Sequence, residues 1–195
     1  MPALWLVASL AVWVACSHEV IPITKVPPLA VPAATTIPLT VAVGEGSFER
    51  SRLNGEGVVL LFAEELRESG IFAGVMHPVP PGASPRWEIE LLAADSGVEP
   101  DSNFWKSAIA SGLPPFAFFI WLQNDYTLEL EALLLDRREL VRSYRGRASI
   151  RHRYQQYANR AEVEAEGVEL LVRSATRLIL DALARDLPGL EQLNR

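Results

Sequence analysis

Cysteine and histidine are scarce in this sequence. Its 195 residues include one cysteine, Cys16, and three histidines, His18, His77 and His152. A single cysteine excludes an intrachain disulfide bond. None of the histidines has a second His, Cys or carboxylate at the spacing typical of metal ligands, so the sequence predicts no metal site.

The motifs of familiar catalytic and phosphate-binding sites are also missing. No G-x-S-x-G, H-E-x-x-H or phosphate-loop sequence occurs. Gly44 and Gly46 form a G-x-G, but Glu49 stands where a dinucleotide fingerprint needs its third glycine, so turn glycines explain the pair better. Glu88 and Glu90 alternate with apolar residues, which is typical of a solvated strand face rather than of paired catalytic carboxylates. We therefore predict a protein that is not an enzyme and needs no cofactor.

Basic residues are fewer than acidic residues in the whole chain, but many of them lie in one segment. The net charge of −6 argues against nucleic acid as a partner, because phosphate binding needs a basic surface. Residues 137–160 nevertheless hold eight arginines and a single acid, Glu139. A basic face on an acidic body predicts docking of an acidic partner, a lipid phosphate or a peptidoglycan carboxylate. The candidate residues for this docking face are Arg142, Arg145, Arg147, Arg151 and Arg153.

An ordinary strand surface is the alternative explanation for these arginines. Arg142, Arg145 and Arg147 would then lie on a solvated strand face, with Glu129 and Glu131 opposite them as cross-strand partners. The sequence leaves both explanations open.

The chain begins with an apolar run and a proline-rich segment. The run covers residues 1–15 and ends at Ala15, just before Cys16. Fifteen residues are short for a membrane-spanning helix, which needs about 20, but they suit a signal-peptide core. Residues 16–37 contain four prolines, with a fifth at Pro38, and no periodic pattern. They predict a tether, either a semi-rigid arm or an arm packed on the domain.

A small residue followed by cysteine resembles the lipobox of bacterial lipoproteins. The resemblance implies that Cys16 becomes the first residue of the mature chain and carries acyl chains such as palmitate, which anchor it in the membrane. Ser17 stands where enterobacterial lipoproteins retained in the inner membrane carry aspartate. This implies an outer-membrane lipoprotein facing the periplasm, with an inner-membrane anchor as the alternative.

Hydrophobic periodicity predicts a β-α-β unit at the start of the folded part. Residues 39–43 alternate as a half-buried strand does. Residues 58–69 follow the helical period, and Gly70 ends them as a C-terminal cap. The strand 71–75 follows at once. This order implies a parallel pair of strands with a right-handed crossover.

The remaining patterns complete an α+β domain. Residues 87–91 alternate as a strand, and residues 126–150 predict a hairpin that turns at 136–139. A helix is predicted at 168–185, with an outer row made of Glu169, Arg173, Arg177, Asp181 and Arg185. A short helix at 103–111 precedes an aromatic loop. The predicted order is strand, helix, strand, strand, short helix with aromatic loop, strand, strand, helix.

We therefore expect a mixed sheet of about five strands with two main helices on one face. The expected boundaries are a signal peptide at 1–15, the tether at 16–37, one α+β domain at 38–187 and a C-terminal tail at 188–195.

Aromatic residues gather in the apolar stretch 113–122. Four of its ten residues are Phe116, Phe118, Phe119 and Trp121. Ten residues are too few to span a bilayer, although aromatic rings are favoured at its interface. The stretch could lie in the domain's own core, in a patch for a protein partner, or against a membrane. These alternatives remain open at the level of sequence.

Taken together, these features resemble small bacterial envelope lipoproteins with a domain similar to the TolB amino-terminal, CsgG or LpoB-like folds. The most similar part is the hairpin that carries Tyr126, Asp136, Ser143 and Tyr144. The resemblance implies a non-enzymatic, lipid-anchored periplasmic adaptor that acts by protein–protein contacts in an assembly, secretion or transport machine. A module that binds lipid or another apolar ligand through residues 113–122 is the alternative. An unidentified envelope protein is the expected partner, and a homo-oligomer is left open.

Overall fold

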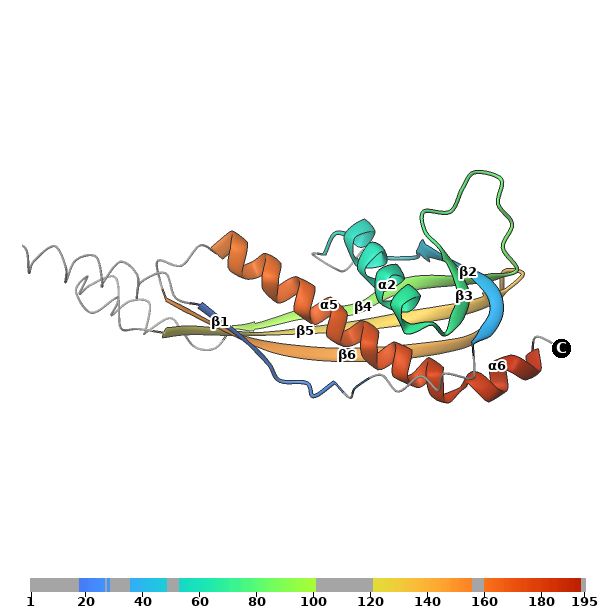
Figure 1. Cartoon of the computed structure of the whole chain (residues 1–195). Helices are drawn as coiled ribbons and strands as arrows, with labels where there is room; N and C mark the ends of the chain where they lie inside the picture. Colours follow the sequence, from blue (N-terminus) through green and yellow to red (C-terminus); the bar gives the residue numbers. More distant parts are fainter. Residues whose placement is uncertain are drawn as a thin grey trace, which may run out of the picture. The chain divides into compact units, whose positions relative to one another are not determined.

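The computed structural model describes residues 18–26, 28, 36–48, 53–100, 121–155 and 160–193. These residues form one six-stranded sheet with the strand order β1-β6-β5-β4-β2-β3, together with three helices (Figure 1). The strands are β1 (His18–Pro22), β2 (Ile37–Glu45), β3 (Phe72–Met76), β4 (Trp87–Pro100), β5 (Trp121–Asp136) and β6 (Glu139–Gln155). The helices are α2 (Gly55–Ser69), α5 (Arg160–Arg185) and α6 (Leu187–Leu193). The predicted mixed α+β fold is confirmed, with six strands where about five were expected and with α6 in addition to the two expected main helices.

The chain divides into two compact units. The first is drawn from Met1–Ile23, Gly97–Thr127 and Ser149–Leu170. The second is drawn from Thr24–Ser96, Leu128–Ala148 and Leu171–Arg195. Strands β4, β5 and β6 and helix α5 supply residues to both units. Each unit is therefore described by its own contacts.

The predicted β-α-β unit lies in the second unit. β2 and β3 pair in parallel, with Val41 opposite Val75, and α2 connects them. The buried side of α2 includes Val58, Phe62 and Leu66, none more than 3% exposed. The helix ends at Gly70, whose φ of 66° is left-handed, a conformation that glycine adopts without steric cost.

Strand β2 is buried on both faces, not on one as its alternation suggests. It pairs in parallel with β4 as well as β3, and Val43 lies opposite Ile89. Val41, Ala42 and Val43 are at most 2% exposed. A strand inside a parallel arrangement is covered on both sides, so the small residue Ala42 is also buried.

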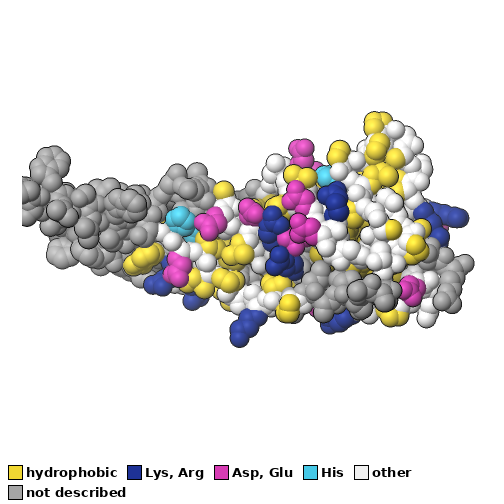
Figure 2. Space-filling view, in the orientation of Figure 1, with side chains coloured by type: hydrophobic (Ala, Val, Ile, Leu, Met, Phe, Trp, Pro, Cys, Tyr) yellow, Lys and Arg dark blue, Asp and Glu magenta, His cyan; other side chains and the backbone are white. Residues whose placement is uncertain are grey.

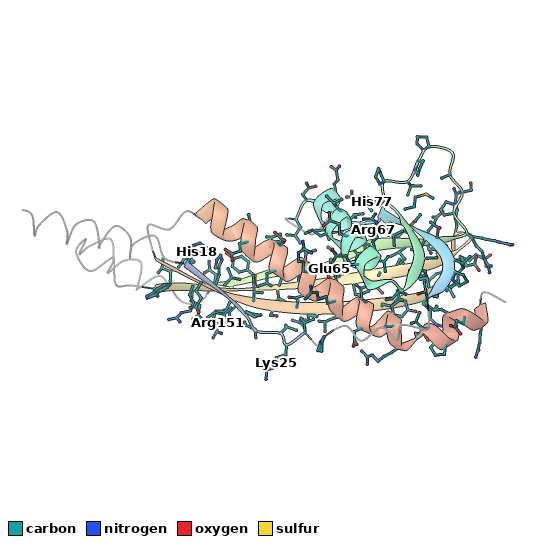
Figure 3. All side chains as sticks on the ribbon, in the orientation of Figure 1. His18, Lys25, Glu65, Arg67, His77 and Arg151 are labelled. Carbon is teal, nitrogen blue, oxygen red and sulfur yellow. The ribbon has the colours of Figure 1, made fainter. Side chains whose placement is uncertain are left out.

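A pair of arginines joins the two longest helices of the second unit. Glu65 of α2 is only 6% exposed, and its carboxylate accepts hydrogen bonds from Arg173 and Arg177 of α5 at 2.6 and 3.0 Å. Figure 3 labels Glu65 on the side of α2 that faces α5. This clamp fixes the spacing of two helices that cover the same side of the sheet.

Three elements differ from the expected boundaries. His18–Pro22, expected in the tether, form β1, which pairs antiparallel with β6 so that Val20 lies opposite His152. Strand β4 continues to Pro100, where a loop was expected, and α6 occupies part of the expected tail. The short helix expected at 103–111 lies outside the described residues. The additional elements raise the strand count to six and the helix count to three.

Candidate functional site: the charged faces of the β5–β6 hairpin

In the second unit, the hairpin has one buried face and one charged face. On β5, Leu128, Leu130 and Leu134 are at most 1% exposed. On β6, Tyr144 and Ala148 are also buried. Figure 1 shows α2 and α5 on one side of the sheet. Because successive strand residues point to opposite faces, the residues between these positions lie on the side away from the core.

Arg145 and Arg147 share this charged face. Arg145 is 64% exposed, and its Nε lies 3.1 Å from Glu131 Oε1 on the neighbouring strand. The hydrogen bond to Glu131 raises the pKa of the Arg145 guanidinium. Arg147 is exposed, and no acidic side chain in the described part of the chain forms an ion pair with it. One arginine thus has the expected cross-strand partner, and its neighbour remains open to an external anion.

Arg142 lies on the opposite face of β6 from Arg145 and Arg147. Its Nε is 3.3 Å from Asp186 Oδ2, and Tyr144 donates a 2.8 Å hydrogen bond to the same oxygen. Burial raises the pKa of Tyr144, and the hydrogen bond to Asp186 raises it further. Asp186 therefore joins β6 to the segment that follows α5. The structure does not bring all five candidate arginines onto one surface.

The first unit contains the other two candidates. Arg151 donates 2.9 and 2.8 Å hydrogen bonds to the two carboxylate oxygens of Asp125. These bonds, together with the charge of Arg151, hold the pKa of Asp125 below its usual value. Arg153 lies 3.6 Å from Glu19 and 5.4 Å from the centre of the Trp121 ring, within cation–π range. These contacts connect β6 with β5 and β1. Figure 3 labels Arg151 near one end of the hairpin.

The predicted aromatic site is only partly visible. Phe116, Phe118 and Phe119 lie outside the described residues, as does Cys16. Trp121 is half-buried beside Arg153, and Leu122 is 3% exposed. The use of this stretch as core, partner patch or membrane contact stays a prediction.

Sequence reasoning missed an aromatic cluster around His152 in the first unit. His152 is 1% exposed, and its ring centre lies 5.9 Å from that of Tyr126 and 6.0 Å from that of Tyr154, both edge to face. Asn124 donates a 3.3 Å hydrogen bond to the Tyr154 hydroxyl. On each strand the residues of the cluster are two positions apart, so the sequence could have indicated that they share a face. The sequence does not indicate the register in which the two strands pair.

Two further properties hold for the described ranges. No group of three or more His, Cys, Asp or Glu side chains there is placed to hold a metal ion. Within the same ranges, no helix is both long enough and apolar enough to cross a bilayer.

No family model matches this chain, and no curated protein matches its sequence. Among solved structures, protein XCC0632 from Xanthomonas campestris, of family DUF330, aligns at 13% identity over 90% of this chain and 98% of its own, with a TM-score of 0.51. The match establishes a shared fold. At this identity it carries no information about function.

Two other solved structures are less similar. A PelC dodecamer from Paraburkholderia phytofirmans aligns at 12% identity over 86% of this chain and 98% of its own, with a TM-score of 0.43. A minor lipoprotein from Acinetobacter baumannii aligns at 10% identity over 82% of this chain and 95% of its own, with a TM-score of 0.38. TM-scores this low do not establish a common fold. The resemblance to TolB amino-terminal, CsgG or LpoB-like domains is not confirmed by these matches and stays a prediction.

Proposed function

We propose that this protein is a lipid-anchored accessory protein of the bacterial cell envelope, and that it acts by protein contacts rather than by catalysis. The observation that carries the proposal is the exposed pair Arg145 and Arg147 on a strand face opposite the helix-covered core. Ala15 and Cys16, at the end of the apolar run, supply the predicted anchor. A charged strand face held near a membrane suits a protein that docks other envelope components.

Two carboxylates of the second unit have a structural role, because each pairs with arginines of another segment. Glu65 joins α2 to α5 through Arg173 and Arg177, and Asp136 accepts two hydrogen bonds of 3.1 Å from Arg86. In both cases the lowered carboxyl pKa is explained by arginine partners that join two segments of the fold. The shared DUF330 fold is compatible with this proposal and does not favour one activity over another.

Acylation of Cys16 can be tested by intact mass and membrane fractionation of the expressed protein beside Cys16→Ala. We expect a mature chain that begins at Cys16, carries diacyl or triacyl mass and is found in the outer-membrane fraction. The variant should lose the added mass. A membrane-bound chain that keeps residues 1–15 without modification would instead indicate an inner-membrane anchor, and the outer-membrane assignment would be wrong.

Docking can be tested by the double substitution Arg145→Glu and Arg147→Glu. Charge reversal should abolish chemical crosslinking to acidic envelope partners, because the exposed guanidinium groups would be replaced by repelling carboxylates. Arg185→Glu is the control, since Arg185 is 74% exposed and pairs with Asp181 of its own helix. Thermal melts should show that both variants are folded. Equal crosslinking by the double variant and the control would contradict docking through this face.

A further inference from the structure

The turn of the β5–β6 hairpin has an unusual backbone. Arg137 and Arg138 connect the strands, and their φ angles are 52° and 70°. Positive φ at both central positions is the requirement of a type I′ turn, which strongly favours Asn-Gly. Left-handed backbone is sterically unfavourable for a residue with a Cβ atom. Two consecutive arginines here indicate that their side chains serve a purpose that outweighs the better turn.

The side chains of the turn face solvent. Arg137, Arg138 and Glu139 are exposed, and Leu140 is 61% exposed. Within the described residues, neither Arg137 nor Arg138 forms a side-chain ion pair. The tip therefore presents two exposed guanidinium groups and a large apolar side chain, with the Glu139 carboxylate beside them, and the charge of Arg137 also acts on Asp136.

A second projection, the loop between β3 and β4, ends beside this turn at Arg86. The loop between β3 and β4 exposes Pro78, Val79, Pro80 and Pro81, and Val79 is 40% exposed. Figure 2 shows hydrophobic side chains on this raised loop and basic ones close to it at the same end of the second unit. We name residues 78–81 and 137–140 together the tip surface.

Arg86 ties the end of the loop to the start of the turn. Arg86, at the end of the loop, donates hydrogen bonds from Nε and Nη2 to both carboxylate oxygens of Asp136, each at 3.1 Å. The backbone N–H of Arg137 donates to the Arg86 carbonyl at 2.8 Å. The end of the apolar loop is therefore held against the start of the basic turn.

We propose that the tip surface binds an anionic lipid bilayer. The loop and Leu140 would enter the interfacial layer, while Arg137 and Arg138 would contact lipid phosphates. Glu139 reduces the formal charge of the turn to +1, so charge alone would hold it weakly and the apolar residues must contribute. Projecting apolar side chains flanked by cations suit a bilayer, whereas binding an acidic protein would require a complementary apolar pocket in that partner. This proposal does not depend on the proposed anchor at Cys16.

A fluorescent probe can report contact with the bilayer directly. The full chain carrying Cys16→Ala and Val79→Cys is labelled with an environment-sensitive dye and mixed with vesicles of phosphatidylcholine and phosphatidylglycerol. We expect the emission of the dye to shift to shorter wavelength and to be quenched by lipid-borne quenchers. Both effects should be weaker with phosphatidylcholine alone. The matched control carries the dye at Glu68→Cys, an exposed position on α2, and should not respond. A silent Val79 probe, or equal responses at both positions, would overturn the proposal. A probe that is silent with vesicles but responds to polyglutamate would favour an acidic protein instead.

A turn substitution tests why the arginines are there. Arg137→Asn with Arg138→Gly supplies the preferred turn residues, so the Tm should rise, while vesicle partitioning should fall about tenfold through the loss of two cations. Arg67→Gln with Arg185→Gln removes the same charge from exposed positions elsewhere in the unit and should leave partitioning nearly unchanged. Unchanged partitioning of the turn variant would contradict lipid binding. A lower Tm would contradict the strained-turn explanation on which the proposal depends.

Discussion

Substituting Gly146 by alanine is expected to lower the free energy of unfolding by about 3 kcal/mol, the upper end of overpacking effects. Gly146 lies on β6 and is buried beneath α5 in the second unit. A Cβ atom at this position would collide with the carbonyl oxygen of Ala175 and lie 3.0 Å from Ile179 Cγ1. The oxygen belongs to the helix backbone, so a side-chain rotation cannot relieve the collision. The helix and the strand would have to separate, with loss of packing along their contact.

Urea unfolding followed by far-ultraviolet circular dichroism measures this effect, and Gly44→Ala is the matched control. Gly44 also lies in a strand of the second unit, but a Cβ atom there meets nothing within 4 Å. Alanine at this position should be neutral or slightly stabilising, because glycine loses more backbone entropy on folding. Similar stabilities for the two variants would show that α5 and β6 are not in backbone contact.

Elements with strong local signals were predictable from the sequence. Helix α2, its end at Gly70 and the hairpin turn after Asp136 depend on side-chain period and turn residues that are close in the chain. Strand β1 was not predictable, because His18–Pro22 has too few residues to show a period and its order comes from pairing with residues 150–154 of β6. The burial of Ala42 likewise depends on neighbours that local alternation does not reveal.

In the candidate site, too, contacts between adjacent strands could be predicted, whereas contacts between distant segments could not. The cross-strand partnership of Arg145 with Glu131 could be anticipated, because it follows from the pairing of adjacent strands. The partnership of Arg142 with Asp186 could not, since 44 residues separate them and the contact depends on where α5 ends. The Glu65 clamp was missed for a similar reason. Arg173 and Arg177 were placed on the outer row of their helix, but α2 lies against that row and supplies a buried carboxylate.

Glu65→Gln is expected to lower the free energy of unfolding by about 2 kcal/mol at neutral pH. The substitution keeps the size of the side chain but removes the charge that Arg173 and Arg177 share. Breaking a fully buried pair costs about 3–5 kcal/mol, and we expect less here because the Arg173 and Arg177 side chains are 33% and 52% exposed. Glu68→Gln, at an exposed position of the same helix, should change stability little. Equal losses in the two variants would contradict the clamp.

The effect of Glu65→Gln should also depend on pH. Burial raises the pKa of Glu65, but hydrogen bonds and charges from Arg177 and Arg173 outweigh it, so the folded pKa lies below the ordinary value of 4.5. The native state therefore holds this carboxylate ionised more readily than the unfolded chain does. Its contribution to stability is present above the unfolded pKa and is lost as pH falls through the folded pKa. In urea titrations from pH 7 to about pH 3, the stability gap between wild type and Glu65→Gln should narrow as the pH falls below the ordinary value. A gap that stays constant over this range would show that packing of the side chain, rather than its charge, joins α2 to α5.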